Sequence, residues 1–260
     1  VVPTNAQAPA PLIAWAHGTT GIATGCAPSL FENPFPYIPA FTEIFKNGWA
    51  FVATDYVGMG TVGQHAYLIG DDAARNLLDA LRAAQQIKEV PFDSRALVWG
   101  HSQGGHSALW SGMRAASYAP DIKLVGIAAL APASDLLGLM QKGKDLPFGK
   151  IISALVLESY AAQYDDVNKV TLANGWSRFW AADVARRCVG GRETLLSLLE
   201  VKLFPSTGLF ADNAMQGPFG ERLRQNTPSQ IIPLPLFICQ GEEDDLVFPT
   251  VQLDYVKTRC

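Results

Sequence analysis

Four short apolar runs, separated by turns and one amphipathic segment, constrain this fold more than any other feature of the sequence. They cover residues 11–16 (PLIAWA), 49–56 (WAFVATDY), 96–100 (ALVWG) and 123–131 (KLVGIAALA). Runs of this kind are typical of strands buried on both faces of a sheet. Residues 71–87 begin with two aspartates and place their alanines and leucines on one helical stripe. This alternation predicts right-handed βαβ crossovers and therefore an α/β fold, with a mainly parallel sheet flanked by helices.

The pattern changes after the fourth run. Residues 133–230 read as helices broken by glycine and proline, without a convincing strand. A strand pattern returns at residues 233–240 (PLPLFICQ), followed by an acidic loop and a helix from about Pro249. We therefore expect a core of residues 1–132 and 231–260 that is interrupted by a helical cap, residues 133–230. Such a cap would lie over the carboxyl edge of the sheet, where α/β proteins bind their ligands.

The composition excludes several classes of protein. The net charge is −4 and no cluster of lysine and arginine is present, so we expect no nucleic-acid partner. Every apolar run is far shorter than the roughly 18 residues of a membrane span, so we expect no transmembrane segment. The four cysteines have no metal-ligand spacing, and we expect neither a metal nor a cofactor. Their even number permits disulfides and secretion.

Ser102 lies in the strongest local motif, G-x-S-x-G at residues 100–104. An apolar run precedes the motif, and a helix is expected to begin near Gly105. In that context the serine occupies a tight turn that exposes its Oγ at the edge of the sheet. The backbone N–H of Gln103 would then point toward the oxygen of a tetrahedral intermediate. The motif predicts a nucleophilic serine.

The sequence His-Gly-Thr-Thr-Gly at residues 17–21 follows the first apolar run. In a fold of this class, the loop after that strand supplies the second backbone donor of an oxyanion hole. Thr19 is the candidate. The alternative is that the His-Gly pair only ends a strand.

Asp244 follows the last apolar run by four residues, in a loop with Asp245 beside it. A carboxylate at this place could orient a catalytic histidine. Asp245 stays open as the alternative, because loop boundaries are not fixed to one residue by sequence. The alternative without a catalytic role is a solvated acidic loop or a weak cation site, although calcium loops space their ligands over about a dozen residues.

A competing motif, G-x-G-x-x-G, occurs at residues 58–63. Taken alone it suggests a nicotinamide-dependent oxidoreductase. The glycine loop of such a protein opens directly into a helix, with an acid about 20 residues further on at the end of the next strand. Here a second loop separates the glycines from the helix expected at Asp71, and Asp79 lies inside that helix. We interpret the glycines as a turn near the site.

Five strings together resemble the secretory lipase family of α/β-hydrolases, which includes the yeast lipase A type. They are WAHGTTG, ATDYVGMGT, GQHAYLIGDDAARNLLDALRAAQQI, WGHSQGGHSAL and CQGEEDDLV. The resemblance covers residues 11–132 and 226–256 and is weaker in the cap. It implies the α/β-hydrolase fold, export from the cell and hydrolysis of carboxylic esters, either acylglycerols or smaller esters.

The resemblance also implies roles for individual residues. Ser102 would be the nucleophile, Asp244 the acid, and Thr19 and Gln103 the oxyanion-hole donors. The family pattern further implies a disulfide between Cys26 and Cys188, with Cys239 and Cys260 either paired or free.

The departure from the family pattern concerns the catalytic histidine, which in the family lies after the acid. The four histidines here are His17, His65, His101 and His106, and none follows Asp244. Of these, only His65 is expected on a loop at the correct edge of the sheet. We expect that the chain is truncated at both ends and that the histidine lies beyond residue 260.

These observations predict a secreted serine ester hydrolase of the lipase type that acts through an acyl-enzyme at Ser102. Its substrate would be a small-molecule or lipid ester, with transient contact to a lipid interface. The alternatives are a non-catalytic binding protein on the same fold and an acyltransferase or a peptidase. We expect the acyl pocket to be formed by aromatic residues of the cap: Trp176, Trp180, Phe204 and Phe210.

Overall fold

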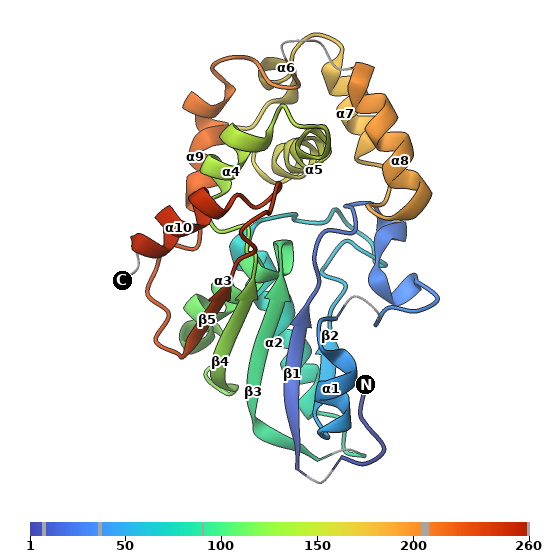
Figure 1. Cartoon of the computed structure of the whole chain (residues 1–260), viewed down its shortest axis with the longest axis vertical. Coiled ribbons are helices and arrows are strands. Elements are labelled where there is room, and N and C mark those ends of the chain that lie inside the picture. The colour runs from blue at the N-terminus through green and yellow to red at the C-terminus, as the bar shows by residue number, and fades with distance from the viewer. Residues whose placement is uncertain (7–8, 36–37, 90, 204–207, 259–260) are drawn as a thin grey trace.

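The computed structural model describes residues 1–6, 9–35, 38–89, 91–203 and 208–258. Its centre is a parallel sheet of five strands in the order β2-β1-β3-β4-β5 (Figure 1). The strand bounds are β1 Ala10–Ala16, β2 Ala50–Ala53, β3 Phe92–His101, β4 Lys123–Leu130 and β5 Leu236–Cys239. The predicted parallel sheet is confirmed, with one strand for each apolar run.

The two faces of the sheet are covered unequally. Helices α2 (Gly70–Gln85) and α3 (Gln103–Tyr118) pack on one face, where Leu77, Leu81 and Val98 are fully buried. On the other face, among the described residues, the short helix α1 (Phe41–Lys46) is the one helix that packs over β1 and β2 (Figure 1). The expectation of strands buried on both faces is therefore wrong toward the β5 edge. There Val125 is 39% and Phe237 60% exposed, and an apolar run alone does not distinguish the two faces.

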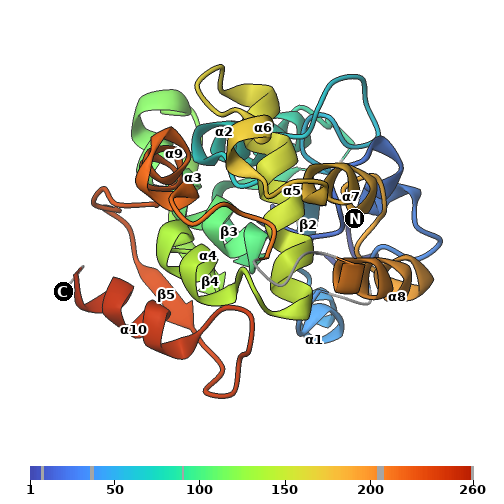
Figure 2. The same cartoon turned by 90° about the horizontal axis from the view of Figure 1, so that it is seen from above.

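Between β4 and β5, the residues that the structure describes form helices, called here the cap helices, and no named strand of the sheet. The helices are α4 Leu136–Gly143, α5 Pro147–Gln163, α6 Lys169–Leu172, α7 Ser177–Val184, α8 Gly191–Glu200 and α9 Pro218–Gln225. They lie above the carboxyl edge of the sheet, and α10 (Pro249–Lys257) follows β5 (Figures 1 and 2). Short 3₁₀ turns cover Thr24–Cys26, Pro28–Leu30, Val201–Leu203 and Ala214–Gln216. None of the helices in the described ranges is long and apolar enough to cross a membrane.

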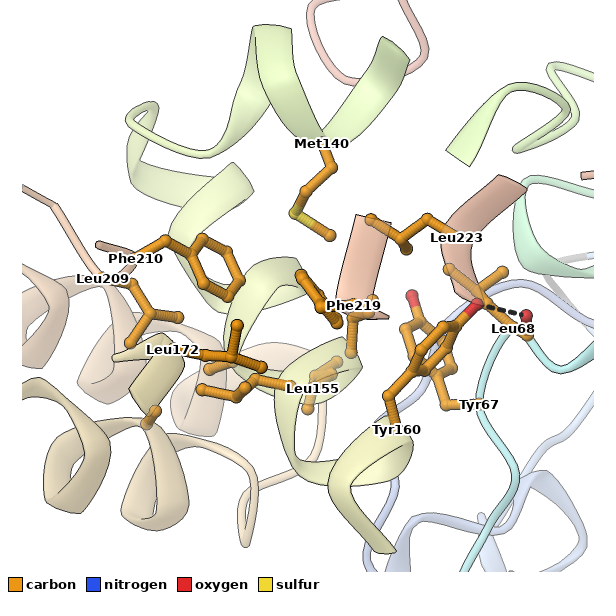
Figure 3. Packing of buried hydrophobic residues seen from close by; sticks show 14 of the residues in the cluster. Tyr67, Leu68, Met140, Leu155, Tyr160, Leu172, Leu209, Phe210, Phe219 and Leu223 are labelled. Carbon is orange, nitrogen blue, oxygen red and sulfur yellow. Dashed lines mark hydrogen bonds between the residues drawn. The ribbon is translucent and has the colours of Figure 1, made fainter. Parts of the chain in front are cut away.

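The hydrophobic core of these helices includes residues from the loop before α2. Tyr67 and Leu68 pack with Leu155, Tyr160 and Phe219 in one cluster (Figure 3). The Tyr160 hydroxyl donates a hydrogen bond to the Leu68 carbonyl oxygen at 3.1 Å. The helices above the sheet are therefore packed onto the chain below them, which fixes their position over the carboxyl edge of the sheet.

Asn226 provides a second attachment, at the end of α9. Its Oδ1 accepts from the Gly70 backbone N–H at 3.0 Å, and its Nδ2 donates to the Tyr164 hydroxyl at 2.8 Å. Its backbone carbonyl accepts from His106 and Trp110 of α3. Asn226 is 4% exposed, so these bonds join α3, α5 and the start of α2 in a buried position.

A disulfide joins Cys26 to Cys188, which confirms the pairing that the resemblance implied. It connects the loop after β1 to the segment between α7 and α8. The Val189 N–H also donates to the Thr20 carbonyl oxygen at 2.8 Å. Cys239 is exposed, and Cys260 lies outside the described residues, so the second predicted pairing is not described.

Candidate active site

Ser102 sits at the turn between β3 and α3, in a backbone conformation that L-residues rarely adopt, with φ of 56° and ψ of −116°. Its N–H donates to the Leu130 carbonyl oxygen at 2.9 Å, and its own carbonyl accepts from the Ala133 N–H. A strained serine held this way by neighbouring backbone is typical of a functional turn. The helix begins at Gln103, two residues earlier than expected.

The glycines of the G-x-S-x-G motif are required by close contacts. A Cβ at Gly100 would lie 2.0 Å from the Gly104 carbonyl oxygen, and a Cβ at Gly104 would lie 1.8 Å from the Ala16 carbonyl oxygen. Both distances are far below van der Waals contact. The turn can therefore pack against β1 only when these two positions lack a side chain.

The Gln103 backbone N–H is the first of α3, so it has no acceptor within the helix. The side-chain Nε2 of Gln103 lies 2.9 Å from Nε2 of His65. His65 Nδ1 lies 3.2 Å from the Val57 carbonyl oxygen, which only accepts, so Nδ1 carries the proton and Nε2 accepts from Gln103. Burial lowers the pKa of His65 to about 4, which keeps this arrangement neutral.

Thr19 reaches the same place from the loop after β1. A Cβ at the preceding Gly18 would lie 3.8 Å from the Cβ of Ser102, so the loop runs directly beside the serine. The Thr19 hydroxyl and the Tyr67 hydroxyl share a hydrogen bond of 2.7 Å. Ser102, Gln103 and Thr19 line one cavity, so the three residues of the sequence prediction are brought together.

Asp244 follows β5 and is half-buried, whereas Asp245 is exposed. One carboxylate oxygen of Asp244 accepts from the N–H groups of Leu246 and Val247 at 2.9 and 2.8 Å, and the other accepts from Gln240 at 3.2 Å. These bonds favour Asp244 over Asp245 as the organised carboxylate. Leu246 lines the cavity beside Ser102, so the acidic loop borders the same site.

The four histidines do not complete a triad with Ser102 and Asp244. His17, His65 and His106 are at most 7% exposed, and His106 Nε2 donates to the Asn226 carbonyl oxygen at 2.7 Å. The residue His101 is exposed as a whole; partial burial of its imidazole lowers its pKa, and the Asp244 charge opposes that shift. Within the described residues, the side-chain partners of Asp244 include no histidine.

Two openings meet at Ser102. The first is a narrow apolar cavity of about 60 Å³. Its apolar lining comes from α4, α5, α9 and the acidic loop: Leu136, Leu139, Met140, Ile152, Val156, Leu223 and Val247. The second is a wider groove of about 880 Å³. It passes Thr19 and Phe148 and reaches the first turn of α8 at Arg192. A substrate at Ser102 could therefore place one arm in each opening.

The predicted aromatic lining of the acyl pocket is wrong for the three residues that the structure describes. Phe210 is 4% exposed in the core of the cap helices, Trp180 packs against that core, and Trp176 is 72% exposed. None of these three lines either opening, and Phe204 lies outside the described residues. Aromatic composition identifies apolar helices but not the side of a helix that faces Ser102.

Sequence reasoning also missed two partners of the site, His65 as the partner of Gln103 and Tyr67 as the partner of Thr19. The pairs are 38 and 48 residues apart in sequence, and no local pattern encodes such contacts. The glycine motif at residues 58–63 lies just before them. Gly58 and Gly60 have φ of 86° and 67°, and α2 begins only at Gly70, so this segment is a turn and not a nucleotide-binding loop.

Comparisons with known proteins identify the family and the fold of this chain. Residues 40–257 match the family model described as "Secretory lipase". Lipase 9 of Candida albicans is 23% identical in an alignment 269 residues long, gaps included, that covers 95% of this chain and 57% of that protein. Lipase A of Moesziomyces aphidis is 26% identical over 136 residues, or 48% of this chain and 29% of that protein.

Two solved structures share the fold. Candida antarctica lipase A in its closed state superposes with a TM-score of 0.76 at 20% identity, covering 100% of this chain and 64% of that chain. The rice cell wall degrading esterase LipA from Xanthomonas oryzae gives a TM-score of 0.79 at 19% identity, covering 98% and 72%. The sheet and the helices above it are thus an α/β-hydrolase fold, and the family match over most of the sequence shows that the chain belongs to the secretory lipase family.

Proposed function

We propose that Ser102 is the nucleophile of a carboxylic ester hydrolase that acts on acylglycerols or smaller esters. The observation that carries this proposal is the strained turn of Ser102 at the junction of an apolar cavity and an open groove. The two openings suit the two arms of an ester, an acyl chain in the apolar cavity and the alcohol portion in the wider groove.

In this mechanism Ser102 Oγ attacks the carbonyl carbon of the ester and gives its proton to a histidine base. The resulting oxyanion accepts hydrogen bonds from the backbone N–H groups of Gln103 and Thr19. The C–O bond to the alcohol breaks, and the alcohol leaves with the proton held by the imidazole. Water then attacks the acyl-Ser102 ester with the same base, which releases the acid and restores the serine.

We further propose that Asp244 holds the imidazole in the tautomer that accepts the serine proton. The described positions of the four histidines support a base supplied by a residue other than these four, because three are buried and none hydrogen-bonds to Asp244. The disulfide between Cys26 and Cys188, together with the family, supports action outside the cell, since disulfides persist in oxidising compartments.

Imidazole rescue tests the proposal with this chain as it exists. A fluorophosphonate probe is mixed with the protein with and without millimolar imidazole, and the adduct is located by mass spectrometry. If only the base is lacking, imidazole should accelerate labelling of Ser102 about tenfold or more. The Ser102→Ala variant is the control and should stay unlabelled in both conditions.

Labelling that persists in Ser102→Ala would assign the adduct to another nucleophile and contradict the proposal. A folded wild-type chain that stays unlabelled in the presence of imidazole would favour the non-catalytic binding protein instead.

A further inference from the structure

A stripe of exposed leucines runs along the outer side of α8 and the 3₁₀ turn after it. Its members, called here the leucine stripe, are Leu195, Leu196, Leu199 and Leu203, which are 60%, 53%, 53% and 58% exposed. Successive residues of an α-helix are turned by about 100°, so 195, 196 and 199 fall within roughly a quarter to a third of the helix circumference. The opposite side holds Ser197, which is 2% exposed.

Both views place α8 at the periphery of the cap helices (Figures 1 and 2). Folding usually removes large aliphatic side chains from water, and isolated exceptions need no explanation. Three leucines on one side of a short helix and a fourth in the turn after it are not isolated. A contiguous apolar surface of this kind is typical of a site that contacts a partner.

The charges around the leucine stripe indicate the kind of partner. The acidic side chains of α8 are engaged, because Glu200 forms an ion pair with Arg187 and Glu193 accepts from the Cys188 backbone N–H. The two basic side chains are Arg192 at the start of the stripe and Lys202 near its end. Both are exposed, and neither has an ion pair within the described part of the chain.

An apolar stripe with cations at both ends complements a surface that is apolar inside and negatively charged outside. An amphipathic helix with leucines on one side and basic residues beside them binds in this way at the boundary of lipid headgroups and acyl chains. A protein partner would need a matching acidic groove, whereas an anionic lipid surface offers this pattern to any helix with this face.

The position of α8 connects this surface to the nucleophile. Gly190, Gly191, Arg192 and Glu193 line the wide groove that also contains Ser102. A lipid layer held against the leucine stripe would therefore lie at the mouth of the groove. We propose that α8 and the 3₁₀ turn after it dock this protein on anionic lipid–water interfaces.

Docking on a lipid surface does not depend on the proposed hydrolysis, and binding alone tests it. The wild-type chain is mixed with phosphatidylglycerol vesicles or phosphatidylcholine vesicles at low salt, and bound protein is measured by flotation. We expect binding to phosphatidylglycerol to be about tenfold tighter or more, because two cations approach the anionic surface. Addition of salt should reduce that difference.

The variant Leu195→Glu/Leu199→Glu places two acids in the leucine stripe without touching the groove. We expect it to bind phosphatidylglycerol vesicles at least about tenfold more weakly. The matched control is Leu253→Glu on α10, since Leu253 is 55% exposed but lies on another element. It should bind as the wild type does, and thermal unfolding checks that all three chains are folded.

The proposal is overturned if the wild type binds neither kind of vesicle. It is also overturned if Leu195→Glu/Leu199→Glu binds phosphatidylglycerol vesicles as tightly as the control Leu253→Glu does. It is also overturned if light scattering shows a wild-type dimer that only Leu195→Glu/Leu199→Glu dissociates, with no vesicle binding. The stripe would then join two copies of the chain. Failure of Ser102 labelling with normal vesicle binding would contradict the proposed hydrolysis and leave the docking surface intact.

Discussion

The two halves of the candidate site are held by different forces. Ser102 follows β3, which has a strand on each side, and its turn is enclosed by backbone contacts that tolerate no Cβ at Gly100 or Gly104. Asp244 follows β5 at the edge of the sheet, and a Cβ at the nearby Gly241 would meet nothing within 4 Å. Steric packing fixes Ser102, the proposed nucleophile, whereas a few hydrogen bonds fix Asp244, the proposed acid, and the two surroundings are called below the nucleophile side and the acid side. Mutations on the two sides should therefore differ in kind.

The largest contrast is expected between Gly104→Ala and Gly241→Ala. A methyl group at 104 would lie 1.8 Å from the Ala16 carbonyl oxygen, so β1 and α3 must separate to admit it. We expect the free energy of unfolding to fall by at least about 4 kcal/mol. Gly241→Ala should change it by less than about 0.5 kcal/mol. Urea unfolding followed by circular dichroism measures both, and similar losses would mean that packing does not distinguish the two sides.

The disulfide strengthens the nucleophile side further, because it joins the loop after β1 to the cap helices across 162 residues of sequence. Replacing Cys26 and Cys188 by alanine should lower the free energy of unfolding by about 2–4 kcal/mol. Cys239→Ala on the edge strand β5 is the control and should have little effect, because that cysteine is exposed. If the two variants had the same unfolding midpoint in urea, the disulfide would not stabilise this part of the fold.

The same contrast explains what the sequence could and could not predict. Around Ser102, strand, turn and helix follow one another within a few residues, and the small residues required by the turn are visible in the motif itself. The parallel sheet and the place of Asp244 after a strand were predictable for the same reason, since each is a local pattern. The side chains that support Gln103 and Thr19 were not, because His65 and Tyr67 reach them through tertiary contacts.

The cap illustrates the limit more sharply. Its helices were predictable from their apolar residues, but the direction in which each helix faces depends on its neighbours. Phe210 therefore lies in the core and Trp176 at the surface, although both were predicted to line a pocket. The aliphatic residues that do line it, such as Met140 and Ile152, carry no distinguishing signal in the sequence.

Low pH should lower the free energy of unfolding through the buried histidines of the nucleophile side. Burial lowers the pKa of His65 and of His106 to about 4, below the value of roughly 6.5 in an unfolded chain. Between these values the unfolded chain binds protons that the folded chain does not. The stability that neutral His65 and His106 provide is therefore complete above pH 6.5 and is lost as the pH falls toward 4.

We expect the free energy of unfolding to fall by about 2 kcal/mol or more between pH 6.5 and pH 4.5. His65→Asn should flatten this slope, because it removes one of the two groups while keeping an amide near Gln103. Urea unfolding at each pH provides the measurement. A slope unchanged in His65→Asn would mean that His65 does not contribute to it.

The smallest effect on stability, and the most informative about the acid side, is expected at Asp244. Asp244→Ala leaves the N–H groups of Leu246 and Val247 without their acceptor and should cost about 1–2 kcal/mol of unfolding free energy. Asp244→Asn keeps an oxygen acceptor there and should cost less than about 1 kcal/mol.

If the carboxylate charge orients an imidazole, Asp244→Asn should nonetheless slow the imidazole-dependent labelling of Ser102 about tenfold or more. Asp245→Asn, at an exposed neighbour, should change neither quantity. Normal labelling in Asp244→Asn would reduce Asp244 to a support of its loop, and the hydrogen bonds that hold the acid side would then be its only role.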